Sequence, residues 1–236
     1  MDNSTTIRVL VGKGKEKKEF AVPMSLLTEK SEFFRIACNG RWKESKEGTV
    51  LLPETTAEIF EAYSHWIHKE EVATSERKSR DESDWCSVLW RFYIRLWIAG
   101  DMLGDGKLRN AVASTMQDTC KDIKHPAGPV AITLAWENSM PDCTLRRLLL
   151  DTYTHFGMHE HIQEHWDEFP AAFLQELLKP TLNSLIGTEH AKRPHKHSIY
   201  YYHEHNEQLP KCMIKWYHHV KASDWENGEI DYSFYA

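Results

Sequence analysis

Over the first seventy residues, short apolar runs alternate with charged stretches, and a glycine or a proline closes several of the runs. Alternation of this kind predicts short strands, whereas apolar residues at spacings of three and four predict helices. We therefore expect strands over residues 7–12, 19–23 and 49–53, and helices over residues 25–34 and 59–67. Because the apolar faces of these helices would cover the strands, the pattern predicts an α/β (α+β) unit, a short three-stranded sheet covered by helices.

From residue 85 onwards, apolar residues recur at spacings of three and four, which predicts an all-helical region. The clearest helix covers residues 85–99, with Asp84 as its N-cap. Its predicted buried face consists of Trp85, Val88, Leu89, Phe92, Leu96 and Ala99. Further helices are expected over residues 107–116, 130–138, 145–156, 159–166 and 170–178.

Four polar residues in these segments have expected structural roles. Ser31 is expected to bond the backbone within or at the start of its helix. Asp101 and Asp105 flank glycines between two predicted helices, and we interpret both as helix caps. Asn110 falls in the middle of a helix, where asparagine is unfavourable, so we expect a buried hydrogen bond from its side chain to the preceding loop.

The patterns divide the chain into three regions. Residues 1–123 form the sheet-containing domain, which includes a charged, exposed loop over residues 70–84. Residues 124–186 form a helical extension, and residues 187–236 form a tail rich in histidine and tyrosine. The tail is expected to be mostly irregular, although its aromatic residues argue against complete disorder.

Composition narrows the possible partners and location. The formal net charge of −6 argues against a nucleic-acid partner, which would favour a clustered basic excess. The five cysteines are scattered without a CxxC pair, which is not a disulfide framework and is typical of a reducing compartment. The opening residues are polar, and no apolar run approaches the ~20 residues that a membrane helix needs. We therefore expect a cytoplasmic or nuclear protein with neither a membrane nor a nucleic acid as partner.

Motifs of common enzyme classes are absent from the sequence. It contains no GxSxG nucleophile motif, no GxxxxGK[ST] phosphate loop and no GxGxxG dinucleotide motif. The basic, glycine-containing residues 12–15 join two predicted strands, so they are interpreted as a hairpin turn. We expect no catalytic residue and no organic cofactor, so the chain is not predicted to be an enzyme.

Histidines near the C-terminus nevertheless suggest a metal site. His203, His205 and Cys212 offer the nitrogen and sulfur ligands that zinc prefers, and a structural zinc is the alternative hypothesis for this region. A fourth ligand would come from His195, His197, His218 or His219. His161 and His165 also stand four residues apart, but a plain helix surface is the preferred interpretation there.

Several short motifs follow one another in a fixed order over about three quarters of the chain. They include Phe20-x-Val22, Ser31-x-Phe33-Phe34, Trp42-Lys43-Glu44-Ser45, Leu103-Gly104-x-x-x-Leu108-x-Asn110 and Trp136-Glu137-Asn138. Their order and spacing resemble those of fungal-type BTB/POZ domain-containing proteins, from roughly residue 6 to residue 178. The resemblance implies a BTB/POZ fold followed by a helical extension, with a function in protein–protein interaction.

The resemblance also implies the kind of partner. Proteins of this family bind copies of themselves, other BTB proteins or the cullin scaffold of a ubiquitin ligase, so we expect an adaptor, with a self-assembling scaffold as the alternative. The residues expected at the interface are Phe33, Phe34, Arg35, Trp42, Tyr63 and Trp66. Trp66 also fits a core position, because it is in register with Ile59 and Tyr63. Pro23 stands where many members carry a histidine, so the resemblance does not extend to the dimer that depends on that histidine.

Overall fold

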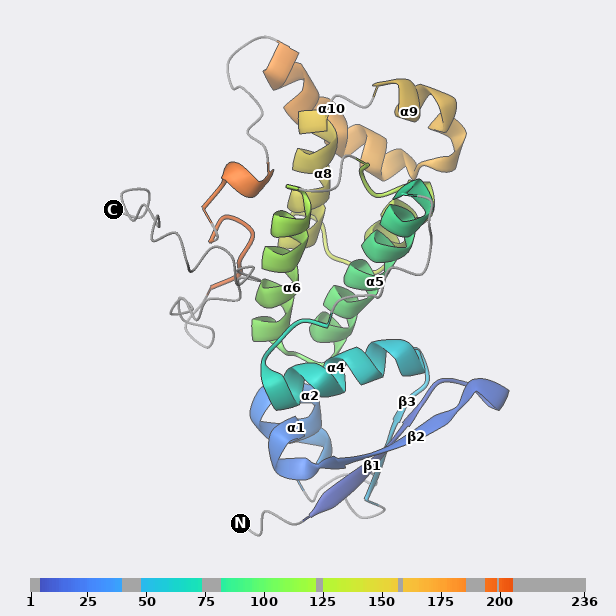
Figure 1. Ribbon diagram of the computed structural model, residues 1–236, viewed down its shortest axis with the longest axis vertical. Coiled ribbons are helices and arrows are strands. Elements are labelled where there is room, and N and C mark those ends of the chain that lie inside the picture. The colour runs from blue at the N-terminus through green and yellow to red at the C-terminus, as the bar shows by residue number, and fades with distance from the viewer. Residues whose placement is uncertain are drawn as a thin grey trace.

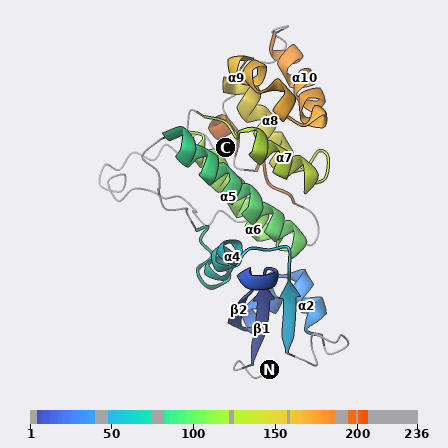
Figure 2. The same ribbon diagram turned by 90° about the vertical axis from the view of Figure 1, so that its right-hand side faces the viewer.

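The computed structural model describes residues 5–39, 48–73, 82–121, 125–156, 159–185, 194–198 and 200–205. In this part of the chain a small three-stranded mixed sheet is followed by a mostly helical region, and the two are stacked along the long axis of the molecule (Figure 1). The long helix α5 (Glu82–Met102) runs between the sheet end and the helices at the other end (Figure 2). The expected α/β class and the small sheet are therefore confirmed.

The sheet has the strand order β2-β1-β3. Its strands are β1 (Thr6–Val11), β2 (Lys18–Pro23) and β3 (Thr49–Leu52), with a short 3-10 turn (Gly14–Glu16) between the first two. Strand β1 pairs antiparallel with β2, with Val9 opposite Phe20, and parallel with β3, with Val9 opposite Val50. Because side chains alternate across a strand, one face of β1 carries buried apolar residues and faces the core. All three predicted strands are present.

Among the described residues, helices α1 (Met24–Lys30), α2 (Glu32–Ala37) and α4 (Ala57–Lys69) accompany the sheet. Phe60 of α4 packs on Phe20 of β2, with the ring centroids 4.8 Å apart. The single helix predicted over residues 25–34 is divided in two, because Ser31 has an extended backbone and separates α1 from α2. The Ser31 Oγ accepts a hydrogen bond from the Phe34 N–H at 3.1 Å, which confirms its expected bond to the backbone.

In the part of the chain that the structure describes, the helical region continues after α5 with further helices and short 3-10 turns. These are α6 (Gly106–Thr119), α7 (Pro129–Glu137), α8 (Thr144–Phe156), α9 (His159–Glu164) and α10 (Ala171–Leu185), with turns at Trp166–Glu168 and Pro194–Lys196. Several predicted boundaries were wrong; for example, α9 ends at Glu164 and not at residue 166. Helix α5 begins at Glu82, so Asp84 lies inside the helix and is not its N-cap, and α10 continues through Pro180 to Leu185.

Helix α5 is buried on most of its surface, not only on the predicted face. Trp90, Tyr93, Ile94 and Trp97 are also buried, whereas Val88 is exposed. The reason is that α4, α6 and α7 all pack against α5. One continuous hydrophobic core therefore extends from the sheet to α10.

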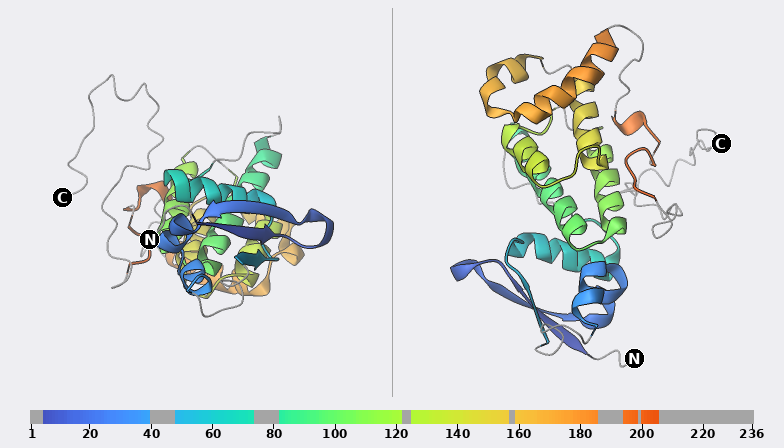
Figure 3. Two further views of the ribbon diagram at one scale, coloured as in Figure 1. Left: turned by 90° about the horizontal axis from the view of Figure 1, so that it is seen from below. Right: turned by 180° about the vertical axis from the view of Figure 1, so that it is seen from behind.

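Residues 194–198 and 200–205, which we call the C-terminal segment, lie beside α6 and α8 (Figure 3). Apart from the turn Pro194–Lys196, this segment has no regular helix or strand, as predicted for the tail. It is nevertheless packed, since Tyr202 is fully buried. Across all the described residues, no helix combines the length and the apolar character needed to cross a membrane.

Candidate interaction surface and histidine cluster

The connection between α5 and α6 fixes α2 in place. The Leu103 carbonyl at the end of α5 accepts hydrogen bonds from the Ser31 hydroxyl at 2.6 Å and from the Phe33 N–H at 3.2 Å. Gly104 follows with φ of 65°, and a Cβ at this position would lie 3.0 Å from the Glu32 Cβ. Gly104 therefore permits both the left-handed turn and the close approach of α2 to the end of α5.

Asp105 joins the same connection to α4. Its Oδ1 accepts a hydrogen bond from the Leu108 N–H at 2.9 Å, and its Oδ2 accepts one from the Trp66 Nε1–H at 3.0 Å. Burial raises the pKa of Asp105, because the charged carboxylate is removed from water. The prediction that Asp105 caps a helix is confirmed, whereas Asp101 lies within α5 and pairs with Arg109 at 2.8 Å.

This arrangement leaves apolar side chains exposed on α2 and at the end of α5. Ile36 is 47% exposed and Met102 is 41% exposed. Phe33 is half-buried and packs edge-on against Phe34, with the ring centroids 5.3 Å apart. The Arg35 side chain is 65% exposed and pairs with Glu32 at 3.1 Å. We call Phe33, Arg35, Ile36 and Met102 the α2–α5 surface.

The structure separates the predicted interface residues into two groups. Phe33 and Arg35 lie on the α2–α5 surface. Phe34, Tyr63 and Trp66 are buried in the core, with at most 1% of each exposed, so they support this surface from inside and do not face a partner. The burial of Phe34 and Tyr63 corrects the expectation that they contact a partner directly, whereas the burial of Trp66 agrees with the core position that its register favoured. Trp42 lies outside the described residues.

Ile36 and Met102 were missed by the sequence reasoning. Ile36 follows Phe33 by three positions on the same short helix, and this spacing was a usable signal. Met102 gave no such signal, because its exposure depends on where α2 packs against the end of α5. That packing joins residues about seventy positions apart in the sequence.

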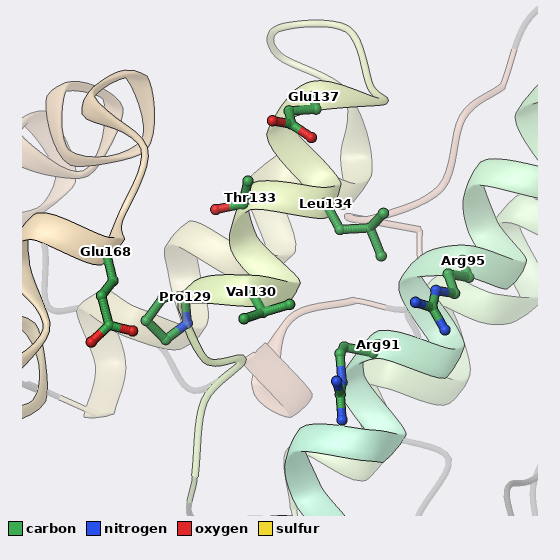
Figure 4. A pocket seen from close by; sticks show the side chains of 8 residues that line it. All are labelled: Arg91, Arg95, Pro129, Val130, Thr133, Leu134, Glu137 and Glu168. Carbon is green, nitrogen blue, oxygen red and sulfur yellow. The ribbon is translucent and has the colours of Figure 1, made fainter.

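A pocket of about 360 Å³ lies between α5, α7 and the turn at Trp166–Glu168 (Figure 4). Arg91 and Arg95 of α5 form one side, and Glu168 lies on the opposite side. The remaining lining residues, all on α7, are Pro129, Val130, Thr133, Leu134 and Glu137. These eight side chains include no histidine or cysteine.

On the side of α6 that faces the C-terminal segment, Asn110 holds the backbone of Glu204. The Asn110 Nδ2 donates to the Glu204 carbonyl at 3.0 Å, and the Asn110 Oδ1 accepts from the Glu204 N–H at 2.8 Å. Asn110 is therefore buried and paired as predicted, but its partner is not the preceding loop. The partner lies 94 residues further along the chain.

Further polar side chains of α6 and α8 hold the segment in the same way. Gln117 donates to the carbonyls of Pro194 and His197 at 2.9 and 3.0 Å, and Arg147 donates to the Tyr201 carbonyl at 3.1 Å. The buried Tyr202 donates from its hydroxyl to Asp151 at 2.8 Å. Arg109 pairs with the Glu204 carboxylate at 2.7 Å. These contacts make the segment part of the helical region.

The segment brings the two predicted histidine ligands together. The Nε2 of His203 lies 2.7 Å from the Ser114 hydroxyl. The rings of His203 and His205 have centroids 5.7 Å apart, and the Tyr200 ring packs edge-on against both. Burial, with the neighbouring His205, lowers the pKa of His203 to about 4, so its imidazole is neutral at pH 7.

The other candidate metal ligands lie apart from this pair or beyond the described residues. His197 stacks on Tyr201, with the ring centroids 4.1 Å apart, and Cys212 lies outside the described residues. Within the described ranges, no group of three or more histidine, cysteine, aspartate or glutamate side chains is arranged to hold a metal ion. His161 and His165 are ring neighbours, and His165 pairs with Glu168 at 2.8 Å, which agrees with a helix-surface role.

In comparisons with known proteins, no family model matches the chain, and no curated protein is similar to it.

Proposed function

We propose that this chain is a protein–protein interaction adaptor with a BTB/POZ-type fold, and that it recruits a client to a cullin-type ubiquitin ligase. The observation that carries the proposal is the α2–α5 surface, where Ile36 of α2 and Met102 at the end of α5 are both exposed and hydrogen bonds to the Leu103 carbonyl join these two elements. The mixed sheet with a helical extension is compatible with the family that the sequence motifs resemble.

The composition of this surface suits a binding site. Interfaces are enriched in aromatic residues, methionine and arginine at their centres, and the α2–α5 surface contains Phe33, Arg35 and Met102. The surface is also held rigidly, because the Leu103 carbonyl accepts from both Ser31 and Phe33. Rigid positioning lowers the entropy lost on binding, so it favours recognition of a partner without rearrangement.

The test is an affinity pull-down of the full-length chain from a fungal lysate, read by mass spectrometry. The wild type is compared with the double variant Ile36→Glu/Met102→Glu, which places two charges on the α2–α5 surface. We expect the wild type to recover a cullin with its ring-finger partner, and the double variant to recover at least about tenfold less, a loss of about 1.4 kcal/mol or more in binding.

The matched control is Val130→Glu/Met140→Glu, which adds the same charges at two exposed positions in the helical region. This variant is expected to recover as much cullin as the wild type. The ligase proposal is wrong if the wild type recovers no cullin. The assignment of the surface is wrong if both double variants recover it equally.

One observation favours a second candidate function, a self-assembling scaffold. Leu51 on β3 is 57% exposed, and β3 is an outer strand of the sheet among the described residues. Exposed outer strands can pair with a strand of another chain. Light scattering after size exclusion would support this alternative if the wild type is a stable oligomer and Leu51→Lys is a monomer. A monomeric wild type would exclude it.

A further inference from the structure

The pocket between α5, α7 and the turn at Trp166–Glu168 carries unlike charges on its two sides. Arg91 and Arg95 lie one helical turn apart on the α5 side, and Glu168 lies across from them (Figure 4). Arg91 donates from its Nε to the Ser87 carbonyl at 3.2 Å, and among the described residues no carboxylate pairs with either guanidinium group. Both groups can therefore bind a carboxylate that belongs to another molecule.

Apolar side chains of α7 lie between the two charged sides. Pro129 and Val130 occupy this position (Figure 4), and Val130 is 66% exposed although it is apolar. Leu134 follows Val130 by one helical turn and is half-buried. Covering exposed apolar surface is favourable, so the pocket offers an apolar contact beside the arginines. Its volume of about 360 Å³ falls within the range of about 300–1,000 Å³ that is common for binding pockets.

Two glutamates of the pocket disfavour a ligand that carries only negative charge. Glu137 and Glu168 both line it, so a free phosphate or a nucleic acid would be attracted by the arginines and repelled by these carboxylates. The His165 Nδ1 lies 2.8 Å from the Glu168 carboxylate and holds it in place. A ligand with an acidic group at one end, an apolar group in the middle and a basic group at the other end would match both sides. A peptide offers this combination in its side chains.

We propose that this pocket binds a short segment of a partner protein that carries an acidic, an apolar and a basic side chain. The acidic side chain pairs with Arg91 and Arg95. The apolar side chain packs on Val130, and the basic one pairs with Glu168. The pocket shares no residue with the α2–α5 surface. Its use as the site that binds the client rests on the proposed adaptor function, whereas the binding of the peptide does not.

The test selects random peptides displayed on phage against the purified full-length chain and against the charge-reversed variant Arg91→Glu/Arg95→Glu. We expect the wild type to enrich peptides that combine an acidic, an apolar and a basic residue. The variant should lose these peptides and enrich peptides with a basic residue in place of the acidic one, a change that a loss of folding would not produce. The matched control Lys15→Glu/Lys17→Glu makes the same charge change at exposed positions between β1 and β2, and should enrich the same peptides as the wild type.

Fluorescence anisotropy with one enriched peptide, labelled with fluorescein, then measures the Kd. Arg91→Glu/Arg95→Glu should raise the Kd at least about tenfold, because it replaces two attractive charges with two repulsive ones. Glu168→Lys should also raise the Kd for this peptide. It should have no such effect on the same peptide with its basic residue replaced by alanine, because that residue is the proposed partner of Glu168.

The pocket proposal is wrong if the wild type enriches no common sequence, or if the charge-reversed variant binds the enriched peptide as tightly as the control does. It is also wrong if inorganic phosphate displaces the labelled peptide as well as the unlabelled peptide does, because the arginines would then form a general anion site.

Two variants of the pull-down separate this proposal from the ligase proposal. Ile36→Glu/Met102→Glu should lose the cullin and keep the peptide, whereas Val130→Glu/Met140→Glu should keep the cullin and bind the peptide more weakly. A wild type that binds the peptide and recovers no cullin would overturn the ligase role alone. A wild type that recovers a cullin and binds no peptide would overturn the pocket proposal alone.

Discussion

The α2–α5 surface and the surface of α6 and α8 differ in whether another part of the chain covers them. On the α2–α5 surface, the backbone groups are bonded within the protein, and the apolar side chains Ile36 and Met102 remain exposed. Beside α6 and α8, polar side chains such as Asn110 and Gln117 bond the backbone of the chain itself. The first surface is open to a partner, whereas the second is already covered by the C-terminal segment.

This difference distinguishes contacts that stabilise the folded protein from exposed side chains that are available to a partner. Hydrogen bonds from Asn110 to the Glu204 backbone are buried, so their loss should destabilise the protein. Exposed Ile36 contributes little to the folded state, so its replacement should affect a partner and not the fold.

The largest effect is expected at Asp105. Replacing it with alanine removes the N-cap of α6 and leaves the buried Trp66 Nε1–H unpaired, so we expect a loss of about 3 kcal/mol in the free energy of unfolding. Urea denaturation measures this value. Asp101→Ala, which removes a half-exposed ion pair with Arg109, is the control and should cost less than about 1 kcal/mol.

A smaller effect is expected at Asn110. Asn110→Ala removes both hydrogen bonds to the Glu204 backbone, which should lower the free energy of unfolding by about 2 kcal/mol. Hydrogen exchange should show faster exchange in residues 200–205 and unchanged exchange in β1. Asn138→Ala is the matched control, because its exposed side chain bonds only to Leu134 of its own helix, and it should cost less than about 0.5 kcal/mol. Equal costs in the two variants would contradict the structural role of the segment.

A still smaller effect on stability is expected from Tyr202→Phe, which removes only the Tyr202 hydroxyl. Tyr202→Phe keeps the buried ring and deletes the hydrogen bond to Asp151, so we expect a loss of about 1 kcal/mol in the free energy of unfolding. Thermal denaturation of the full-length chain measures the change. Tyr201→Phe at an exposed neighbouring position should have a smaller effect, and a reversed order would mean that Asp151 does not hold the segment.

The smallest effect on stability is expected on the α2–α5 surface. Ile36→Glu should change the free energy of unfolding by less than about 0.5 kcal/mol, because the side chain is already half in water. The same urea denaturation experiment measures it. A loss comparable to that of Asp105→Ala would show that Ile36 belongs to the core, and would remove the basis for a binding surface there.

Local sequence patterns predicted those parts of the fold that depend on neighbouring residues in the sequence. The three strands and the cap at Asp105 follow from alternation and from a capping residue before a helix. The break at Ser31 was missed, because the apolar spacing continues across it, whereas in the structure Ser31 has an extended backbone, caps α2 and bonds to Leu103.

The candidate sites depend on contacts between residues that are far apart in the sequence. Trp66 meets Asp105 across 39 residues, and Asn110 meets Glu204 across 94 residues, so no periodicity could predict either pair. The proximity of His203 and His205 was predictable from their spacing, since they are two residues apart. Their contact with Ser114, 89 residues from His203, was not.

Hydrogen exchange of the full-length chain, with and without the purified cullin, would show whether the α2–α5 surface is the binding site. We expect slower exchange in α2 and at the end of α5 when the cullin is present, and no change in residues 200–205 or in α7. The Ile36→Glu/Met102→Glu variant should lose this protection. Protection confined to α7 or to the C-terminal segment, or no protection anywhere in the chain, would contradict the claim that the α2–α5 surface is the binding site.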